Sequence, residues 1–118
     1  MSVESLLNEI KKSPEVLVFA TVIQSIDENY TYEAREFKNG IGDDPLINEA
    51  GTNQGSCKVF AFAQINHLNE QETLVCFGEH YRDVVADPDG ESHANIRRFM
   101  RDGWAGINFD QCPLVLKT

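Results

Sequence analysis

The residues best suited to chemistry lie in one short segment, residues 48–58, which reads Asn-Glu-Ala-Gly-Thr-Asn-Gln-Gly-Ser-Cys-Lys. This polar stretch runs directly into the apolar residues 59–63. Asparagine and serine before an apolar run are typical of a helix N-terminus. A thiol in the first turn of a helix has its thiolate stabilised by the helix dipole, and Lys58 adds a positive charge. Cys57 is therefore a candidate nucleophile.

A nucleophilic thiol also needs a base and groups that orient its substrate. His93 and His80 are the candidate bases for Cys57. The side-chain amide of Asn53 or Gln54 could orient a substrate or face a developing oxyanion. Together these residues describe a small cysteine-dependent enzyme or a redox-responsive protein.

The alternative is that Cys57 is only packed, since a lone cysteine behaves as a small hydrophobic residue. Its neighbours Asn48, Gly51 and Gly55 then have one of two roles. They shape a binding pocket, or they fold a tight turn over the core, because glycine permits backbone conformations closed to other residues. The residue types favour the turn.

Basic residues concentrate late in the chain. An arginine guanidinium pairs with carboxylates and phosphates through two parallel hydrogen bonds, so an arginine cluster is a candidate binding surface for a small anionic ligand or a protein partner. Alternatively, the arginines only neutralise nearby acidic side chains. The candidate binding residues are Arg82, Arg97 and Arg101, and the nearby acidic residues are Asp83, Asp87 and Asp102.

Composition narrows the classes of partner. The 118 residues carry 19 acidic and 10 basic side chains, a net charge of −9. Attraction to nucleic acid or to an anionic membrane surface is therefore disfavoured, and we expect neither as a partner. The length predicts a single domain over residues 1–118. No nucleotide-binding or metalloprotease motif occurs, so we expect no cofactor.

Metal sites and membrane spans are also not indicated by the sequence. The three cysteines are widely spaced without a C-x-x-C pair, which argues against a disulfide framework or structural zinc and favours a reducing cytosol. Residues 87–91 begin like a calcium loop, but Ser92 and Arg98 stand where that loop needs glycine and glutamate. We interpret them as a turn and expect no metal. The longest apolar run, residues 16–23, is too short to span a bilayer, and no secretory signal is visible.

Helical periodicity predicts two helices before residue 30. The first follows Ser2, whose hydroxyl suits an N-cap, and carries apolar residues at helical spacing. The second follows Ser13 and begins with Pro14, which is favoured in the first turn of a helix. Its predicted apolar stripe comprises Val16, Phe19, Ala20, Ile23 and Ile26.

Two or three further helices are expected after residue 56. Residues 57–67 are apolar on both faces, which is typical of a buried central helix. Residues 70–86 follow the near capping box that begins at Asn69. The last helix is expected between Ser92, as its N-cap, and Gly103, as its C-terminal stop.

Strand patterns are short and few. Residues 30–34 alternate, as do residues 107–109 and 114–116, and the last two segments could pair with the first. Residues 40–56 lack regular periodicity, and long loops of this kind tend to be functional. We therefore predict an α+β, mainly α fold, with about four to five helices around a central buried helix and a small antiparallel sheet.

Eight short motifs follow one another between residues 30 and 117. They are Tyr30-x-Tyr32, Phe37-x-Asn39-Gly40, Asn48-x-Ala50-Gly51-x-Asn53-x-Gly55-Ser56-Cys57-Lys58, Cys76-Phe77-Gly78, Tyr81-Arg82-Asp83-Val84, Pro88-x-Gly90, His93-x-Asn95-Ile96-Arg97-x-Phe99-Met100 and Gly103-Trp104-x-Gly106-Ile107. In this order they resemble the HopJ (HopPmaJ) type III effector family. The resemblance implies a bacterial cytoplasmic protein, similar to a plant-pathogen protein delivered to a host cell by type III secretion, and brings no reaction or catalytic set.

Two functional hypotheses follow. The first is a non-enzymatic effector or interaction protein that binds an unknown protein partner or a small anionic ligand through residues 40–56 and the arginine surface. The second is the cysteine-dependent enzyme or redox-responsive protein that uses Cys57 with His93 or His80.

Overall fold

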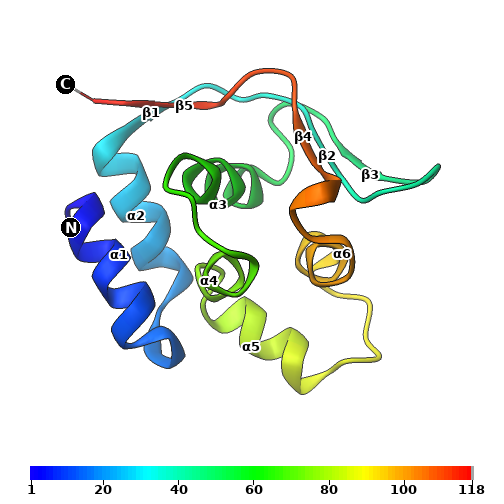
Figure 1. Cartoon of the computed structure of the whole chain (residues 1–118), viewed down its shortest axis with the longest axis horizontal. Coiled ribbons are helices and arrows are strands. Elements are labelled where there is room, and N and C mark those ends of the chain that lie inside the picture. Colours follow the sequence, from blue (N-terminus) through cyan, green and yellow to red (C-terminus); the bar gives the residue numbers. More distant parts are fainter. Residues whose placement is uncertain (118) are drawn as a thin grey trace.

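The structure is a computed structural model that describes residues 1–117 (Figure 1). The helices of this part of the chain are α1 (Val3–Lys12), α2 (Phe19–Asn29), α3 (Gln54–Ile65), α4 (Glu70–Val75), α5 (Glu79–Ala86) and α6 (Ala94–Asp102), with 3-10 turns η1 (Pro14–Val16) and η2 (Gly103–Gly106). The strands are β1 (Tyr30–Tyr32), β2 (Phe37–Asn39), β3 (Leu46–Asn48), β4 (Ile107–Phe109) and β5 (Leu114–Leu116). The predicted α+β, mainly α class is confirmed. Within residues 1–117, no helix is both long and apolar enough to cross a membrane.

Helix α3 lies at the centre of the fold, as its two apolar faces predict (Figure 1). Residues 59–63 are each 1% exposed or less. The ring of Phe60 has its centroid 5.8, 5.4 and 5.0 Å from those of Phe37, Phe77 and Phe99. Aromatic pairs of this kind each contribute about 0.5–1.5 kcal/mol beyond their burial. Phe60 therefore joins β2, the end of α4 and α6 into one core.

Helix α1 forms as its sequence predicts. The hydroxyl of Ser2 accepts a hydrogen bond from the backbone N–H of Ser5 at 3.0 Å, which caps the first turn. Leu6 and Ile10, four residues apart on one face, are buried. Local sequence thus decides both where α1 begins and which face it buries.

Helix α2 begins later than predicted. Residues 14–16 form only the turn η1, and Val16 is 65% exposed in place of starting an apolar stripe. The first turn of α2 is capped from another helix, because the Glu79 carboxylate accepts a hydrogen bond from the backbone N–H of Phe19 at 2.8 Å. This hydrogen bond lowers the pKa of Glu79. Because the capping residue lies 60 residues away in the sequence, the residues around Phe19 do not predict where α2 begins.

The single helix predicted for residues 70–86 is divided into α4 and α5 at Gly78. The capping box at Asn69 is confirmed. Gly78 has a φ of +59°, and a Cβ there would lie 2.6 Å from the backbone nitrogen of Phe19 and 2.9 Å from the carbonyl oxygen of Leu17. Glycine is therefore required for the α4–α5 junction to approach the start of α2.

The strands form two small antiparallel sheets. β1 pairs with β5, with Tyr30 opposite Leu116, so this predicted pairing is confirmed. β4 pairs with β2 and not with β1, in a sheet of order β3-β2-β4. The prediction that residues 40–56 form one irregular loop was wrong, since they contain β3 and the start of α3. Strands of three residues carry too little alternation to be recognised without their partners.

Candidate functional site

A cavity of about 280 Å³ opens between the N-termini of α3 and α6. We call it the α3–α6 pocket. Segments that are far apart in sequence form its wall: the start of α2, the start of α3, the α4–α5 junction and the start of α6. The lining residues are Phe19, Asn53, Gly55, Ser56, Phe77, His80 and residues 93–96.

Both helix N-termini at the α3–α6 pocket lack a side-chain cap. Asn53 and His93 occupy the N-cap positions of α3 and α6, and neither side chain makes a capping hydrogen bond. The predicted cap at Ser92 was therefore wrong. The first N–H groups of a helix have no partner within the helix and carry its positive partial charge. Uncapped amides of α3 and α6 are thus available at one cavity.

Asn53 and His93 also share a strained backbone. Their φ and ψ angles are 47° and 47° for Asn53, and 55° and 55° for His93, in the left-handed region. Residues with a side chain adopt this conformation rarely, and such residues cluster at functional sites, where the surrounding structure holds them in place. The two strained N-caps therefore mark the α3–α6 pocket as a candidate functional site.

A network of asparagine side chains joins the two helix N-termini, and three of its four residues are buried. We call it the asparagine network: Asn39 on β2, Asn48 on β3, Asn53 and Asn95. Asn95 Oδ1 accepts from Asn39 Nδ2 at 3.0 Å and from Asn48 Nδ2 at 3.1 Å. Asn48 Oδ1 accepts from Asn95 Nδ2 at 2.9 Å and from Asn53 Nδ2 at 2.7 Å. Asn39 Oδ1 is buried without a hydrogen-bond partner. The four hydrogen bonds nevertheless link β2, β3 and both helices, and so fix the spacing of the α3 and α6 N-termini.

The structure brings both candidate histidines to the α3–α6 pocket. The half-buried ring of His80 lies 4.8 Å from that of Phe19 and 4.9 Å from that of His93, measured between centroids. Asp83, one turn further along α5, completes a group in which one ligand atom from each of His80, Asp83 and His93 lies within 4.8 Å of the others. Sequence reasoning missed Asp83 as a partner, although its three-residue spacing from His80 places both on one helix face.

The structure places the other residues predicted around Cys57 in different environments. Gly55 lines the α3–α6 pocket, and Asn48 lies behind it in the asparagine network. Gln54 is exposed, and its side-chain amide donates to the carbonyl oxygen of Gly51 at 3.3 Å. Gly51 itself is exposed with a φ of +88°, which fits a turn.

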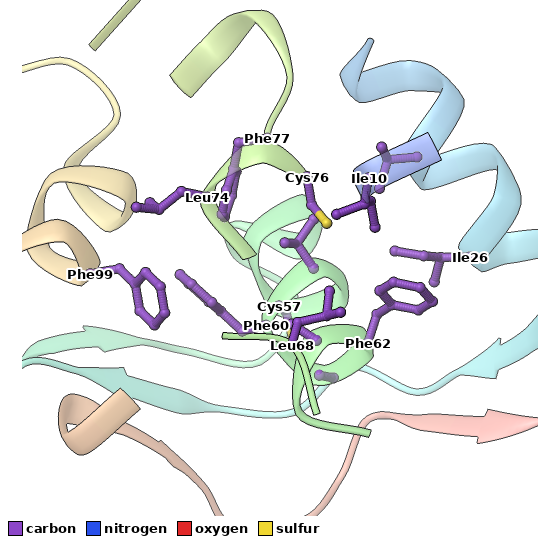
Figure 2. Packing of buried hydrophobic residues seen from close by; sticks show 14 of the residues in the cluster. Ile10, Ile26, Cys57, Phe60, Phe62, Leu68, Leu74, Cys76, Phe77 and Phe99 are labelled. Carbon is purple, nitrogen blue, oxygen red and sulfur yellow. The ribbon is translucent and has the colours of Figure 1, made fainter. Parts of the chain in front are cut away.

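Cys57 lies apart from this pocket, inside the core. Its side chain is 1% exposed and packs within the hydrophobic cluster around α3 (Figure 2). Its sulfur is 3.8 Å from the carbonyl oxygen of Arg35. Burial raises the pKa of the Cys57 thiol, so the thiolate needed for nucleophilic attack is disfavoured. These observations support the packed-thiol alternative.

We expect Cys57 to react with iodoacetamide at least about 100-fold more slowly than Cys112 at pH 7.5, because its raised pKa leaves less thiolate and attack requires local opening. Cys112 is exposed and serves as the internal control. Mass spectrometry of proteolytic peptides measures both rates in one sample. Equal rates at the two cysteines would contradict the packed role.

Of the candidate binding arginines, Arg97 and Arg101 lie together on α6 and line two common hollows, whereas Arg82 lies on α5. Arg97 Nη1 donates to the carbonyl oxygen of Asp87 at 2.9 Å and so closes the turn before α6. Arg101 Nε lies 2.9 Å from Asp102, and hydrogen bonds from Arg101 and Arg98 hold the pKa of that carboxyl well below its usual range. Arg82 lines a separate hollow, beside Tyr81. The ion pair with Asp102 supports the neutralising role for Arg101, whereas Arg97 supports the turn through backbone carbonyl oxygens.

Comparison with known proteins identifies the family to which the chain belongs. The family model for the HopJ type III effector protein matches residues 3–114, so α1 and α2 belong to the match in addition to residues from 30 onward. The crystal structure of the unknown-function protein VPA0580 is similar, with a TM-score of 0.93 and 41% identity over 99% of this chain and 95% of that chain. No curated protein matches the chain. The chain belongs to the HopJ type III effector protein family.

Proposed function

We propose that the protein acts by binding a small anionic ligand in the α3–α6 pocket, and not by thiol catalysis. One observation carries the proposal: two uncapped helix N-termini and two histidines converge on one cavity. The buried Cys57 has no part in this site.

The electrostatics of the α3–α6 pocket favour an anion despite the net charge of −9. Each helix N-terminus carries roughly half a positive elementary charge and directs backbone N–H groups at a ligand. A carboxylate or phosphate group accepts several such hydrogen bonds at once. Around Gly55 and Ser56 on one side and Ala94 on the other, donors of two helices would face the same group.

The size and the walls of the pocket define the class of ligand. A cavity of about 280 Å³ lies at the small end of ligand sites. The rings of Phe19 and Phe77, with centroids 6.2 Å apart and nearly parallel planes, give it an apolar wall. A compact molecule with one anionic group and a short apolar part, such as a small carboxylate or phosphate ester, fits this combination.

Gly55→Ala tests the proposal at the pocket wall. A Cβ at residue 55 would lie 2.7 Å from Cζ of Phe19, so the ring of Phe19, which lines the pocket, must shift and change the shape of the pocket wall. We expect the variant to bind inorganic phosphate and acetate at least about 10-fold more weakly in calorimetric titrations, a loss of about 1.4 kcal/mol. Alanine is favoured over glycine in helices by about 1 kcal/mol, which helps the variant stay folded.

Gln64→Ala is the matched control, because Gln64 is exposed near the other end of α3. It should bind both anions as the unmodified protein does. Binding that is unchanged in Gly55→Ala, or lost equally in both variants, would contradict a site at the α3–α6 pocket.

Family membership supports a second part of the proposal, that the bacterium delivers the protein to a host cell by type III secretion. A reporter fused to the chain tests delivery by comparing bacteria with and without a functional secretion system. A ligand taken up after delivery would then be a host metabolite, and one taken up before delivery a bacterial one.

A further inference from the structure

We propose that His80, Asp83 and His93 bind one divalent transition-metal ion at the mouth of the α3–α6 pocket. This inference rests on the proposed function only in assigning the ion's open positions to the anion. The three ligand atoms are already gathered by α5 and by the start of α6, without any contribution from the amides that face the anion.

The separations are close to those of a metal site. One ligand atom from each residue lies within 4.8 Å of the other two. A tetrahedral ion with bonds of about 2.1 Å holds its ligand atoms about 3.4 Å apart, so each pair of ligand atoms must approach by at most about 1.4 Å. Asp83 and His93 are exposed and His80 is half-buried, which leaves room for this adjustment.

The backbone directs the ligands from two sides. His80 and Asp83 are three residues apart on α5, a spacing that places two side chains on the same helix face. His93 reaches the group from the left-handed N-cap of α6. That strained conformation is held by the following turn, where Asn95 enters the asparagine network. The left-handed conformation therefore places the imidazole of His93 opposite α5, whereas a regular helix start would direct this side chain elsewhere.

The three side chains have no other partners in residues 1–117. None of them makes a hydrogen bond or an ion pair there, whereas the carboxylates of Glu79 and Asp102 each accept hydrogen bonds. The His80 and His93 rings lie 4.9 Å apart at an interplanar angle of 36° without a hydrogen bond between them. A cation shared by the two imidazoles and the carboxylate would give all three a partner.

The ligand set selects the type of ion. Two imidazole nitrogens and one carboxylate oxygen suit Zn²⁺, Fe²⁺, Co²⁺ or Ni²⁺, whereas Ca²⁺ and Mg²⁺ prefer a shell of oxygen ligands. Three protein ligands leave at least one coordination position open, as in metal sites that bind an exogenous molecule. His80 and His93 both line the α3–α6 pocket, so the open position faces the proposed anion.

Titration of metal-free protein with Co²⁺ tests the site, followed by visible absorption and by calorimetry. All proteins carry Cys112→Ser, so that the exposed thiol does not compete for the metal. We expect one Co²⁺ per chain, displaced by Zn²⁺, and a loss of affinity of at least about 10-fold in His80→Ala and in Asp83→Asn. His67→Asn is the matched control, because His67 is exposed and lies outside the group.

The outcomes separate the two proposals. Saturable binding with the expected variant effects supports the metal site, and the thermal midpoint of each metal-free variant confirms that it is folded. Binding that His80→Ala and Asp83→Asn leave unchanged, or the absence of saturable binding, would overturn it. Phosphate titrations in the presence of a chelator test the anion proposal without metal.

Discussion

Replacing Asn95 with leucine is expected to destabilise the protein by about 1–3 kcal/mol, the cost of one unsatisfied buried group, because Asn48 Nδ2 loses its acceptor while Asn39 Nδ2 keeps the backbone carbonyl oxygen of residue 95 at 2.9 Å. Asn95 accepts from the Nδ2 groups of Asn39 and Asn48 and donates to Asn48 Oδ1. Leucine has a similar size but can neither accept nor donate a hydrogen bond. Urea-induced unfolding measures the change in the free energy of unfolding.

The same variant should lose anion binding, since the asparagine network fixes the distance between the α3 and α6 N-termini. Asn108→Leu is the matched control, because Asn108 is exposed on β4. Surface substitutions usually change stability by less than about 0.5 kcal/mol. If Asn95→Leu is no less stable than Asn108→Leu, or binds phosphate as tightly, the network does not have the structural role assigned to it.

Replacing Gly78 with alanine is expected to cost about 2–5 kcal/mol of the free energy of unfolding. The φ of +59° costs a residue with a Cβ about 1–2 kcal/mol. The Cβ would also lie 2.6 Å from the Phe19 backbone nitrogen, and forced overpacking of this kind adds about 1–3 kcal/mol. The contact joins the α4–α5 junction to the segment that Glu79 caps, so Phe19 and His80 should shift and weaken binding in the α3–α6 pocket.

Gly42→Ala separates the conformational cost of a positive φ from the cost of the close approach at Gly78. Gly42 also has a positive φ, +93°, but a Cβ added there would have no other atom within 4 Å. We therefore expect only the conformational part of the cost, about 1–2 kcal/mol, and unchanged phosphate binding. Equal losses of stability in the two variants, measured by urea unfolding, would show that the close approach at Gly78 is unimportant.

Elements whose ends are decided by neighbouring residues could be predicted from the sequence. The cap at Ser2 and the capping box at Asn69 are hydrogen bonds over three residues. The stop at Gly103 depends on one residue with a φ of +63°. The central position of α3 followed from apolar residues on both of its faces. In each case the cause lies within one or two turns of the chain.

Elements whose ends depend on distant contacts could not be predicted in this way. The start of α2 is capped by Glu79, and the break at Gly78 is needed only because α2 passes close to it. β2, β3 and β4 are three residues each and are stabilised by one another. Ser92 had the right type for the cap of α6, but His93 takes that position in the left-handed conformation.

The candidate site was found in part. Residue types identified His80, His93 and Asn53, and the structure gathers them at one cavity. Sequence reasoning placed these residues around Cys57, because a cysteine at a helix N-terminus is a candidate thiolate. The sequence does not show which face of the first helical turn points into the core. Cys57 takes the inner face and Gly55 the pocket face. Asp83 was assigned to charge neutralisation because its neighbour in sequence is an arginine.

The central claim is that the N-termini of α3 and α6 bind one anion together. Titration of ¹⁵N-labelled, metal-free protein with inorganic phosphate, followed by amide chemical shifts, tests it most directly. We predict that the amides of Gly55, Ser56 and Ala94 shift most and saturate with a single dissociation constant. Shifts at these amides no larger than those at the capped first turns of α1 and α4, or different dissociation constants for α3 and α6, would contradict the claim.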